Sequence, residues 1–265
     1  MEPMQQLLEI MQQLRDPQSG CPWDLRQTYR SILPFTLEEA YEVADAIERG
    51  DMAELRDELG DLLFQVVFYS EIAREEGHFD FNDVARGICD KMIRRHPHVF
   101  ADARYHSEEA LRHAWEGQKE HERAQRNPDA RSSQMDGVAQ ALPALIRAEK
   151  LQRRAARVGF DWADVRGALE KVREEFDEVG EALQQADPDA LQDELGDLMF
   201  AMVNVLRLSG LDAEQTLSRA NRKFERRFRA MENILRDQQI TQLSSLSLEQ
   251  LDAAWERVKS AERDC

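Results

Sequence analysis

The 265-residue sequence lacks the features that define several classes of protein. Its three cysteines, Cys21, Cys89 and Cys265, are far apart and form no Cys-x-x-Cys pair. This pattern argues against a disulfide framework or a zinc site and favours reduced thiols in a cytoplasm. No basic segment precedes an apolar run at the N-terminus, so we expect no signal peptide. No apolar stretch is long enough to cross a bilayer, so no membrane partner is expected.

Positive charge and strand signals are also scarce. The 35 Lys and Arg residues are outnumbered by 52 Asp and Glu residues, which gives a net charge of −17. A surface this acidic repels nucleic acid and anionic lipid, so neither is an expected partner. Small phosphate ligands stay compatible with it if a divalent metal reverses the local field. Runs of β-branched residues are few and Asn-Gly turns are absent, so we expect an all-α protein.

What the chain does have is an internal repeat. The segment LRDELGDLLFQV (55–66) returns as LQDELGDLMFAM (191–202), with eight of twelve positions identical at an offset of 136 residues. Four further pairs recur in the same order: 21–24 with 158–161, 36–43 with 173–180, 90–96 with 222–228, and 115–119 with 255–259. The repeat predicts tandem duplicated helical-bundle domains at 1–120 and 138–265, joined by a polar linker at 121–137.

Capping signals place a helical hairpin in the first half. Thr36 with Glu39 three residues later is a capping-box pattern, so we predict a helix that begins at Thr36 and ends at Gly50. Asp51 starts a second helix, which runs to Gly77. Because the connection is short, the two helices should be antiparallel neighbours.

The second helix of this hairpin is apolar nearly all round. Leu59, Leu62 and Val66 form its predicted core stripe. A helix that is apolar on every side needs partners on every side. One thin half-domain does not supply them, so we predict a homodimer.

Acids recur on the facing sides of the predicted hairpin. Glu39 and Glu42 are three residues apart on the first helix, as are Glu58 and Asp61 on the second, so four carboxylates should meet. Like charges at this spacing destabilise a helix by roughly 0.2–0.5 kcal/mol per pair, and a bound cation removes that repulsion. Oxygen ligands without Cys or His select a hard ion, Mg²⁺ or Mn²⁺. The second half repeats the set as Glu175, Glu178, Glu194 and Asp197.

Two other interpretations fit these acids less well. A single Glu-x-x-Glu in so acidic a chain is usually a solvated face, but a constellation on two helices that occurs twice argues against that reading. A carboxylate di-iron site requires Glu-x-x-His on two helices. Glu75-x-x-His78 exists, but it lies at a helix end and has no counterpart in the second half.

A second layer of paired residues is basic. Lys91 and Arg95 are four residues apart, and Trp115 and Lys119 have the same spacing. Their counterparts in the second half are Lys223, Arg227, Trp255 and Lys259. Lys and Arg beside a divalent metal are what a polyphosphate requires, and a Trp can stack on a nucleobase. Without a function, the Lys and Arg pairs would be a solvated helix face and each Trp a core residue. Their recurrence in both halves favours a functional role.

Together these segments resemble the MazG family of nucleoside triphosphate pyrophosphohydrolases. The resemblance rests on Glu-Glu-x-x-Glu followed by Glu-x-x-Asp, and on GCPWD, RRHPHVF, VGFDW and KFERRF. It implies an all-α NTP pyrophosphatase fold, usually dimeric. It also implies a Mg²⁺-dependent reaction in which a nucleoside triphosphate and water give a nucleoside monophosphate and pyrophosphate.

The resemblance also assigns roles to residues. It implies that the four acids of each half bind metal and that Lys223, Arg227 and Lys259 contact phosphate, with Trp255 on the base side. Glu38 and Glu174, which precede the first acid of each set, are candidates to orient the water. Some relatives carry a Lys four residues before the Glu-x-x-Asp motif, where this chain has Glu54 and Ala190.

Specificity and the division of labour stay open at this level. We favour broad use of NTPs and dNTPs, with two alternatives: a pyrophosphatase for one dNTP or damaged nucleotide, and a sensor that binds nucleotide without turnover. We expect the second half to be the main catalyst. Lys223 and Arg227 lie mid-helix, whereas Pro97 should end the first-half helix near Arg95 and leave that residue on a fraying turn.

Overall fold

The computed structural model describes all of the chain except residues 1, 109, 112–113, 116, 119–121, 123–132, 186, 241 and 264–265. The described residues are helices and connecting loops, with no strand among them. Contacts divide the chain into two compact units, Met1–Pro128 and Asp129–Cys265. None of the described helices is long and apolar enough to cross a membrane.

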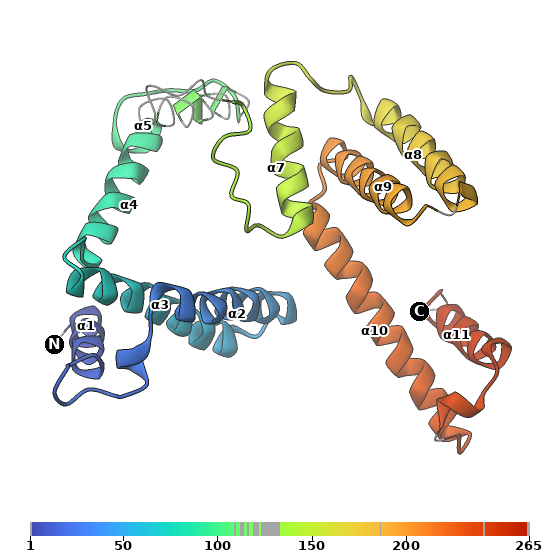
Figure 1. Ribbon diagram of the computed structural model, residues 1–265, viewed down its shortest axis with the longest axis horizontal. Coiled ribbons are helices and arrows are strands. Elements are labelled where there is room, and N and C mark those ends of the chain that lie inside the picture. Colours follow the sequence, from blue (N-terminus) through green and yellow to red (C-terminus); the bar gives the residue numbers. More distant parts are fainter. Residues whose placement is uncertain are drawn as a thin grey trace. The chain divides into compact units, whose positions relative to one another are not determined.

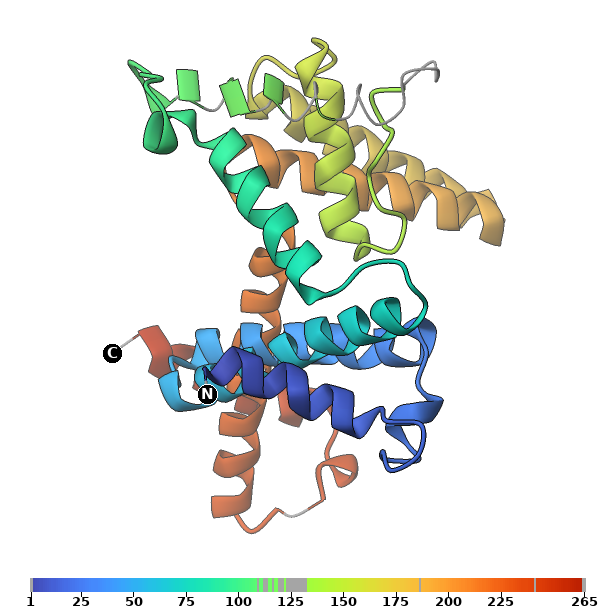
Figure 2. The same ribbon diagram turned by 90° about the vertical axis from the view of Figure 1, so that its left-hand side faces the viewer.

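The first unit is built on the α2–α3 hairpin (Figure 1). α1 packs on α3, and α4 follows α3 and continues into the short α5 (Figures 1 and 2). The helices are α1 (Pro3–Leu14), α2 (Tyr29–Arg49), α3 (Met52–Glu75), α4 (Phe81–Arg95) and α5 (Pro97–Phe100), with a 3-10 turn at Asp24–Arg26. Five fully buried side chains from α1, α2 and α3 form its core: Met11, Ile32, Val67, Phe68 and Ile72.

The second unit repeats this plan. α7 packs on α9 as α1 packs on α3, α8 and α9 form the hairpin, and α10 packs against α11. The helices are α7 (Ala144–Arg157), α8 (Val165–Gln185), α9 (Pro188–Leu208), α10 (Ala213–Asp237) and α11 (Leu248–Arg263). A separate apolar core, Met231, Leu235, Ala254 and Val258, holds α11 against the C-terminal half of α10.

Local signals explain the turn of the first hairpin. Gly50 has φ +70°, the left-handed conformation that ends a helix at least cost when the residue is glycine. The carboxylate of Asp51 then accepts hydrogen bonds from the backbone N–H groups of Ala53 and Glu54, which caps α3. The predicted break at Gly50 and the restart at Asp51 are confirmed.

The predicted start of the preceding helix is wrong. α2 begins at Tyr29 because Thr28 and Ser31 form the capping box. Thr36 lies inside the helix, where its hydroxyl bonds the carbonyl of Ile32 and the hydroxyl of Tyr69. Ser31 stands where the usual capping box has Glu or Gln, so the sequence pattern favoured Thr36.

The predicted core stripe of α3 is also wrong within the chain. Leu59 and Val66 are 50% and 37% exposed, whereas Val67 and Phe68 are buried at 1% each. The core therefore lies on the neighbouring face of α3. Both hairpins expose large apolar side chains, including Leu63 of the first and Phe176 and Met199 of the second.

Candidate active site

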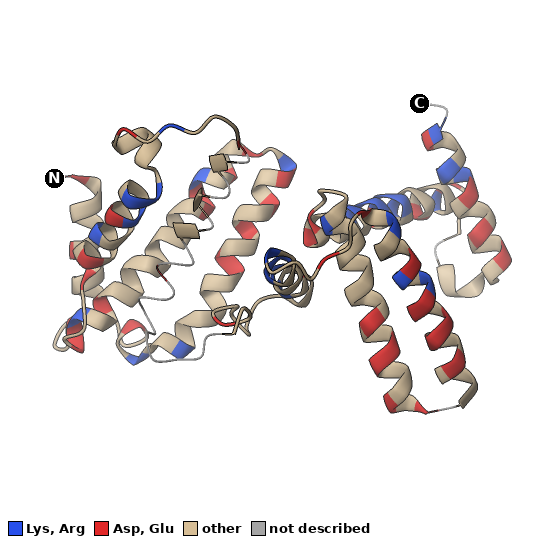
Figure 3. Ribbon diagram, turned by 90° about the horizontal axis from the view of Figure 1, so that it is seen from above, with Lys and Arg blue, Asp and Glu red and all other residues tan. Residues whose placement is uncertain are grey.

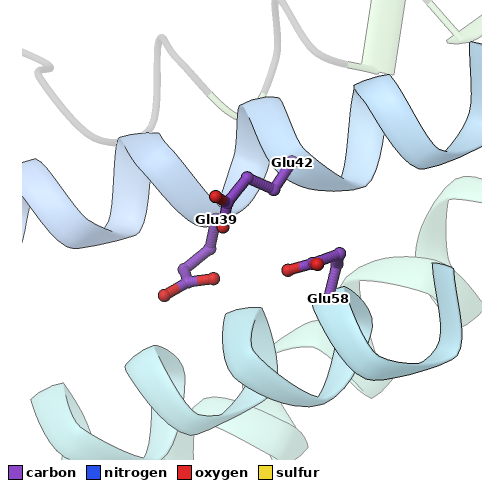
Figure 4. Close-up of side chains that lie close together, drawn as sticks. All are labelled: Glu39, Glu42 and Glu58. Carbon is purple, nitrogen blue, oxygen red and sulfur yellow. The ribbon is translucent and has the colours of Figure 1, made fainter. Parts of the chain in front are cut away.

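The acids of each hairpin converge between its two helices. In the first half, carboxylate oxygens of Glu39, Glu42 and Glu58 lie within 4.8 Å of one another (Figure 4). In the second half, Glu175, Glu194 and Asp197 form the equivalent group within the same limit. Figure 3 shows acids along the length of the α8–α9 hairpin.

One predicted acid in each half lies beside this group of three. Asp61 is close enough to Glu39 and Glu58 to raise their pKa values by repulsion. Glu178 lies within hydrogen-bonding reach of Glu175, and this contact is the largest cause of its raised pKa. The four predicted acids of each half are thus neighbours, with three of them placed to share one ion.

Three of these acids, Glu39, Glu58 and Glu178, have raised pKa values. Removal from water is the largest cause of the raised pKa of Glu39, followed by the charges of Asp61, Glu42 and Glu58. The pKa of Glu58 is raised by the same two effects. For Glu178 the hydrogen bond with Glu175 is the largest cause. A divalent cation among the carboxylates would reverse these shifts, because it favours the charged form of every acid.

A lysine already sits on the second cluster. The ammonium of Lys171, one helical turn before Glu175, lies 2.6 Å from Glu175 and 2.9 Å from Glu174. Glu175 is only 4% exposed, so a positive charge beside it is expected. The first half has Phe35 at the corresponding position, so comparison of the repeats did not reveal this lysine.

The predicted bases lie on α4, α10 and α11. Among the described residues none of them pairs with an acid of the clusters. Lys223 is exposed, Lys259 binds Glu256 at 2.5 Å, and Lys119 lies outside the described residues. Arg95 and Arg227 each bind a glutamate, Glu122 and Glu262 respectively, that the sequence analysis did not single out.

The two tryptophans contact different neighbours. Trp255 is half-buried, packs on the core between α10 and α11, and lies 5.4 Å from the ring of Phe224. Trp115 meets the ring of His96 edge-on at 4.9 Å. His96 ends α4 as predicted, and Pro97 begins α5.

A cavity of about 450 Å³ opens beside the second cluster. It is lined by α7, the loop that carries VGFDW and α9, including Trp162, Phe200 and Asn204. Phe200 follows Asp197 by three residues, so the cavity begins one helical turn along α9 from that acid. Most of its lining is apolar, and its volume is that of a small-molecule site.

Two polar side chains, Gln152 and Arg207, line this cavity. Gln152 is 6% exposed and donates its amide N–H to the carbonyl of Phe200 at 2.7 Å. Its own carbonyl oxygen is buried and receives no hydrogen bond from any described residue. Arg207 binds Asp161 and the side-chain oxygen of Asn204, which fixes the loop against α9.

Comparison with known proteins places these features in one family. The MazG nucleotide pyrophosphohydrolase domain matches residues 27–100 and 165–231. The chain is 50% identical, over 100% of both chains, to the nucleoside triphosphate pyrophosphohydrolase of Escherichia coli K12. It is 41% identical to the Thermotoga maritima protein named nucleoside triphosphate pyrophosphohydrolase/pyrophosphatase MazG, over 97% of this chain and 96% of that one.

The chain belongs to the MazG family. The resemblance and the all-α fold expected from the sequence are thereby confirmed. The family domain covers both acid clusters, both hairpins, α4 and most of α10, and it does not extend to α11.

Three parts of this MazG chain escaped the sequence analysis. They are Lys171, the pair Glu122 and Glu262, and the cavity beside α9. The glutamates were detectable, since each follows a matched tryptophan by seven residues. The cavity was not, because it arises where the two repeats differ.

Proposed function

We propose that the second half hydrolyses nucleoside triphosphates to nucleoside monophosphates and pyrophosphate, with broad use of NTPs and dNTPs. The observation that carries the proposal is the cluster of Glu175, Glu194 and Asp197 one helical turn from an apolar cavity. The acids suit the triphosphate end of the substrate once a cation is bound. The cavity suits the nucleoside.

The donor set fits Mg²⁺, with Mn²⁺ as a substitute. All ligands are carboxylate oxygens, and Glu175, Glu178, Glu194 and Asp197 would hold the ion. When bound, such an ion neutralises phosphate charge and makes water more acidic. The contact between Lys171 and Glu175 supports this assignment, because a positive group already occupies the cluster.

The remaining steps belong to side chains of the chain itself. Arg227, Lys223 and Lys259 bind the phosphates and stabilise negative charge on the departing pyrophosphate. Glu174 is exposed beside the metal ligands and orients the water that attacks the α-phosphorus. The walls of the cavity hold the nucleoside, and the unpaired oxygen of Gln152 accepts a base N–H. Few other polar atoms line the cavity, which agrees with broad specificity.

The chain forms a homodimer. The exposed apolar faces of both hairpins, such as Leu63 and Met199, support a homodimer in which a second copy covers them. The free thiols of Cys21 and Cys89 support a cytoplasmic location. Light scattering at micromolar concentration tests the homodimer, and a monomer of 30.7 kDa would contradict it.

A second candidate function, sensing without turnover, applies to the first half alone. It keeps an acid cluster but not the residues that open the cavity, so it suits metal or nucleotide sensing without turnover. The experiment that tests both roles is pyrophosphate release from the eight common NTPs and dNTPs, with Mg²⁺ and with EDTA. We expect release from several substrates in Mg²⁺ and none in EDTA. Nucleotide binding without release would favour the sensor.

A further inference from the structure

One carboxylate binds two neighbouring arginines in each half. In the second half, Glu262 accepts from the Nη2 of Arg226 at 2.9 Å and from the Nε of Arg227 at 2.7 Å. In the first half, Glu122 also accepts from two neighbouring arginines, from the Nε of Arg94 at 3.0 Å and from the Nη2 of Arg95 at 2.5 Å. Hydrogen bonds from the arginines lower the pKa of Glu122 to about 2 and also lower that of Glu262. The arrangement therefore recurs in contacts as well as in sequence.

The glutamate shares a helix face with other predicted site residues. Trp255, Lys259 and Glu262 follow one another at spacings of four and three, which places them along one side of α11. The ion pairs join that side of α11 to the middle of α10. This contact lies one helical turn beyond the apolar core that holds the two helices together, since Arg227 precedes Met231 by four residues and Glu262 follows Val258 by four.

The two halves use their arginines differently. Arg95 donates to Glu122 through both Nε and Nη2. Arg227 donates to Glu262 through Nε alone, and no described residue accepts from its Nη1 or Nη2. A guanidinium held at Nε keeps its two terminal nitrogens for another oxyanion, and arginine binds phosphate through two such parallel hydrogen bonds.

We propose that Glu262 is a positioning residue for the pyrophosphohydrolase reaction. It fixes Arg227 at Nε, so that the terminal nitrogens stay aligned for the phosphate oxygens of the substrate. The inference rests on the proposed role of Arg227 as a phosphate contact. Glu122 differs, because it also engages the Nη2 of Arg95 and so leaves that arginine fewer free N–H donors than Arg227 has.

The first test compares Glu262→Gln with the matched control Glu122→Gln in the full chain. We expect kcat/KM for a nucleoside triphosphate to fall roughly 10- to 100-fold in Glu262→Gln, the usual effect of losing an orienting partner. Glu122→Gln should stay within about two-fold of the wild type. An unchanged or faster Glu262→Gln enzyme would overturn the proposal, since Glu262 would then be neutral or would block Arg227.

A double-mutant cycle separates positioning from a merely structural tie. Arg227→Lys keeps the charge but has no Nε–H, so adding Glu262→Gln to it should cost little more. Arg226→Ala removes the other partner of Glu262 and should leave kcat and KM near wild type. Additive losses in the cycle, or an equal loss from Arg226→Ala, would mean that Glu262 only joins two helices.

Melting temperatures and the Glu262→Asp variant separate a loss of positioning from a loss of folding. Melting temperatures show whether each variant folds, and Glu262→Asp, which retains a carboxylate, should recover part of the activity lost in Glu262→Gln. If Glu262→Gln fails to fold, Glu262→Asp alone decides, and full activity at wild-type melting temperature would overturn the positioning role. If Arg227→Lys itself has wild-type kinetics, the planar fork of Arg227 is not needed, and the proposal that Glu262 aligns it fails while the proposed function of the protein stands.

Discussion

The two halves share their acids but differ in the space beside them. Position 68 of the first half corresponds to position 204 of the second, and the residues are Phe68 and Asn204. Phe68 is 1% exposed, packs on Met11 and lies under the guanidinium of Arg15 at 5.3 Å. Asn204 instead lines the 450 Å³ cavity. A duplicated acid cluster thus stands beside a packed core in one half and beside an open pocket in the other.

The difference between cavity and core is a better reason to expect unequal activity in the two halves than the position of Arg95. The sequence predicted that Arg95 would lie on a fraying turn and be held loosely. The helix does end there, but Arg95 is only 19% exposed and binds Glu122 at 2.5 Å. Arg95 is held firmly by a partner 27 residues away, so loose positioning does not distinguish the halves. The two halves are distinguished by the cavity beside α9 and the packed core at Phe68.

The largest expected effect comes from removing one acid from each half. Glu178→Ala should lower pyrophosphate release by more than about 100-fold, because loss of a metal ligand exceeds the 10- to 100-fold effect of losing its orienting partners. Glu42→Ala should leave most of the activity. Initial rates with excess Mg²⁺ measure both variants. The opposite ranking would overturn the assignment, and equal losses would indicate two working sites.

The cavity itself can be closed. Asn204→Phe copies the first-half residue into the second half and should lower kcat/KM by about 10- to 200-fold, the range over which a pocket discriminates by shape. Phe68→Ala provides the converse and should lower the free energy of unfolding by about 3–5 kcal/mol without loss of activity. Steady-state kinetics and urea denaturation measure the pair. Wild-type kinetics for Asn204→Phe would show that the nucleoside does not enter this cavity.

The sequence predicted more of the site than of the packing around it. Gly50, Asp51 and the acid spacings act within a few residues, so a single sequence reveals them. The start of α2 was missed because its cap pairs Thr28 with Ser31 and not with the Glu or Gln of the usual pattern. The partners of Arg95 and Arg227 lie 27 and 35 residues away. The cavity depends on one difference between repeats, which a comparison based on identities passes over.

Metal removal should distinguish the halves less sharply, because both keep an acid cluster. Mg²⁺ at 100 times its dissociation constant should raise the free energy of unfolding by about 2.7 kcal/mol at a single site. Asp197→Ala should abolish the share of this gain that comes from the second half and leave the fold intact. Thermal denaturation across a Mg²⁺ titration measures it. A gain in Asp197→Ala equal to that of the wild type would show that the second cluster does not bind the ion.

The smallest effect expected is a pH dependence that both clusters share. Without metal, the raised pKa values of Glu39, Glu58 and Glu178 mean that the folded protein binds protons more tightly than the unfolded chain does at these positions. Their contribution to stability is therefore complete below the ordinary carboxyl pKa of 4.5 and is lost as the pH rises through the raised values.

Saturating Mg²⁺ should remove or invert this dependence, because it binds the ionised acids. The gain in melting temperature from Mg²⁺ should thus grow as the pH rises from about 4.5 toward neutrality. In Glu178→Gln the increase should be smaller, because one of the raised groups no longer titrates, while the part due to Glu39 and Glu58 stays. Denaturation curves at several pH values, each with Mg²⁺ and with EDTA, measure it. A gain that does not change with pH would mean that these carboxylates are not the ligands.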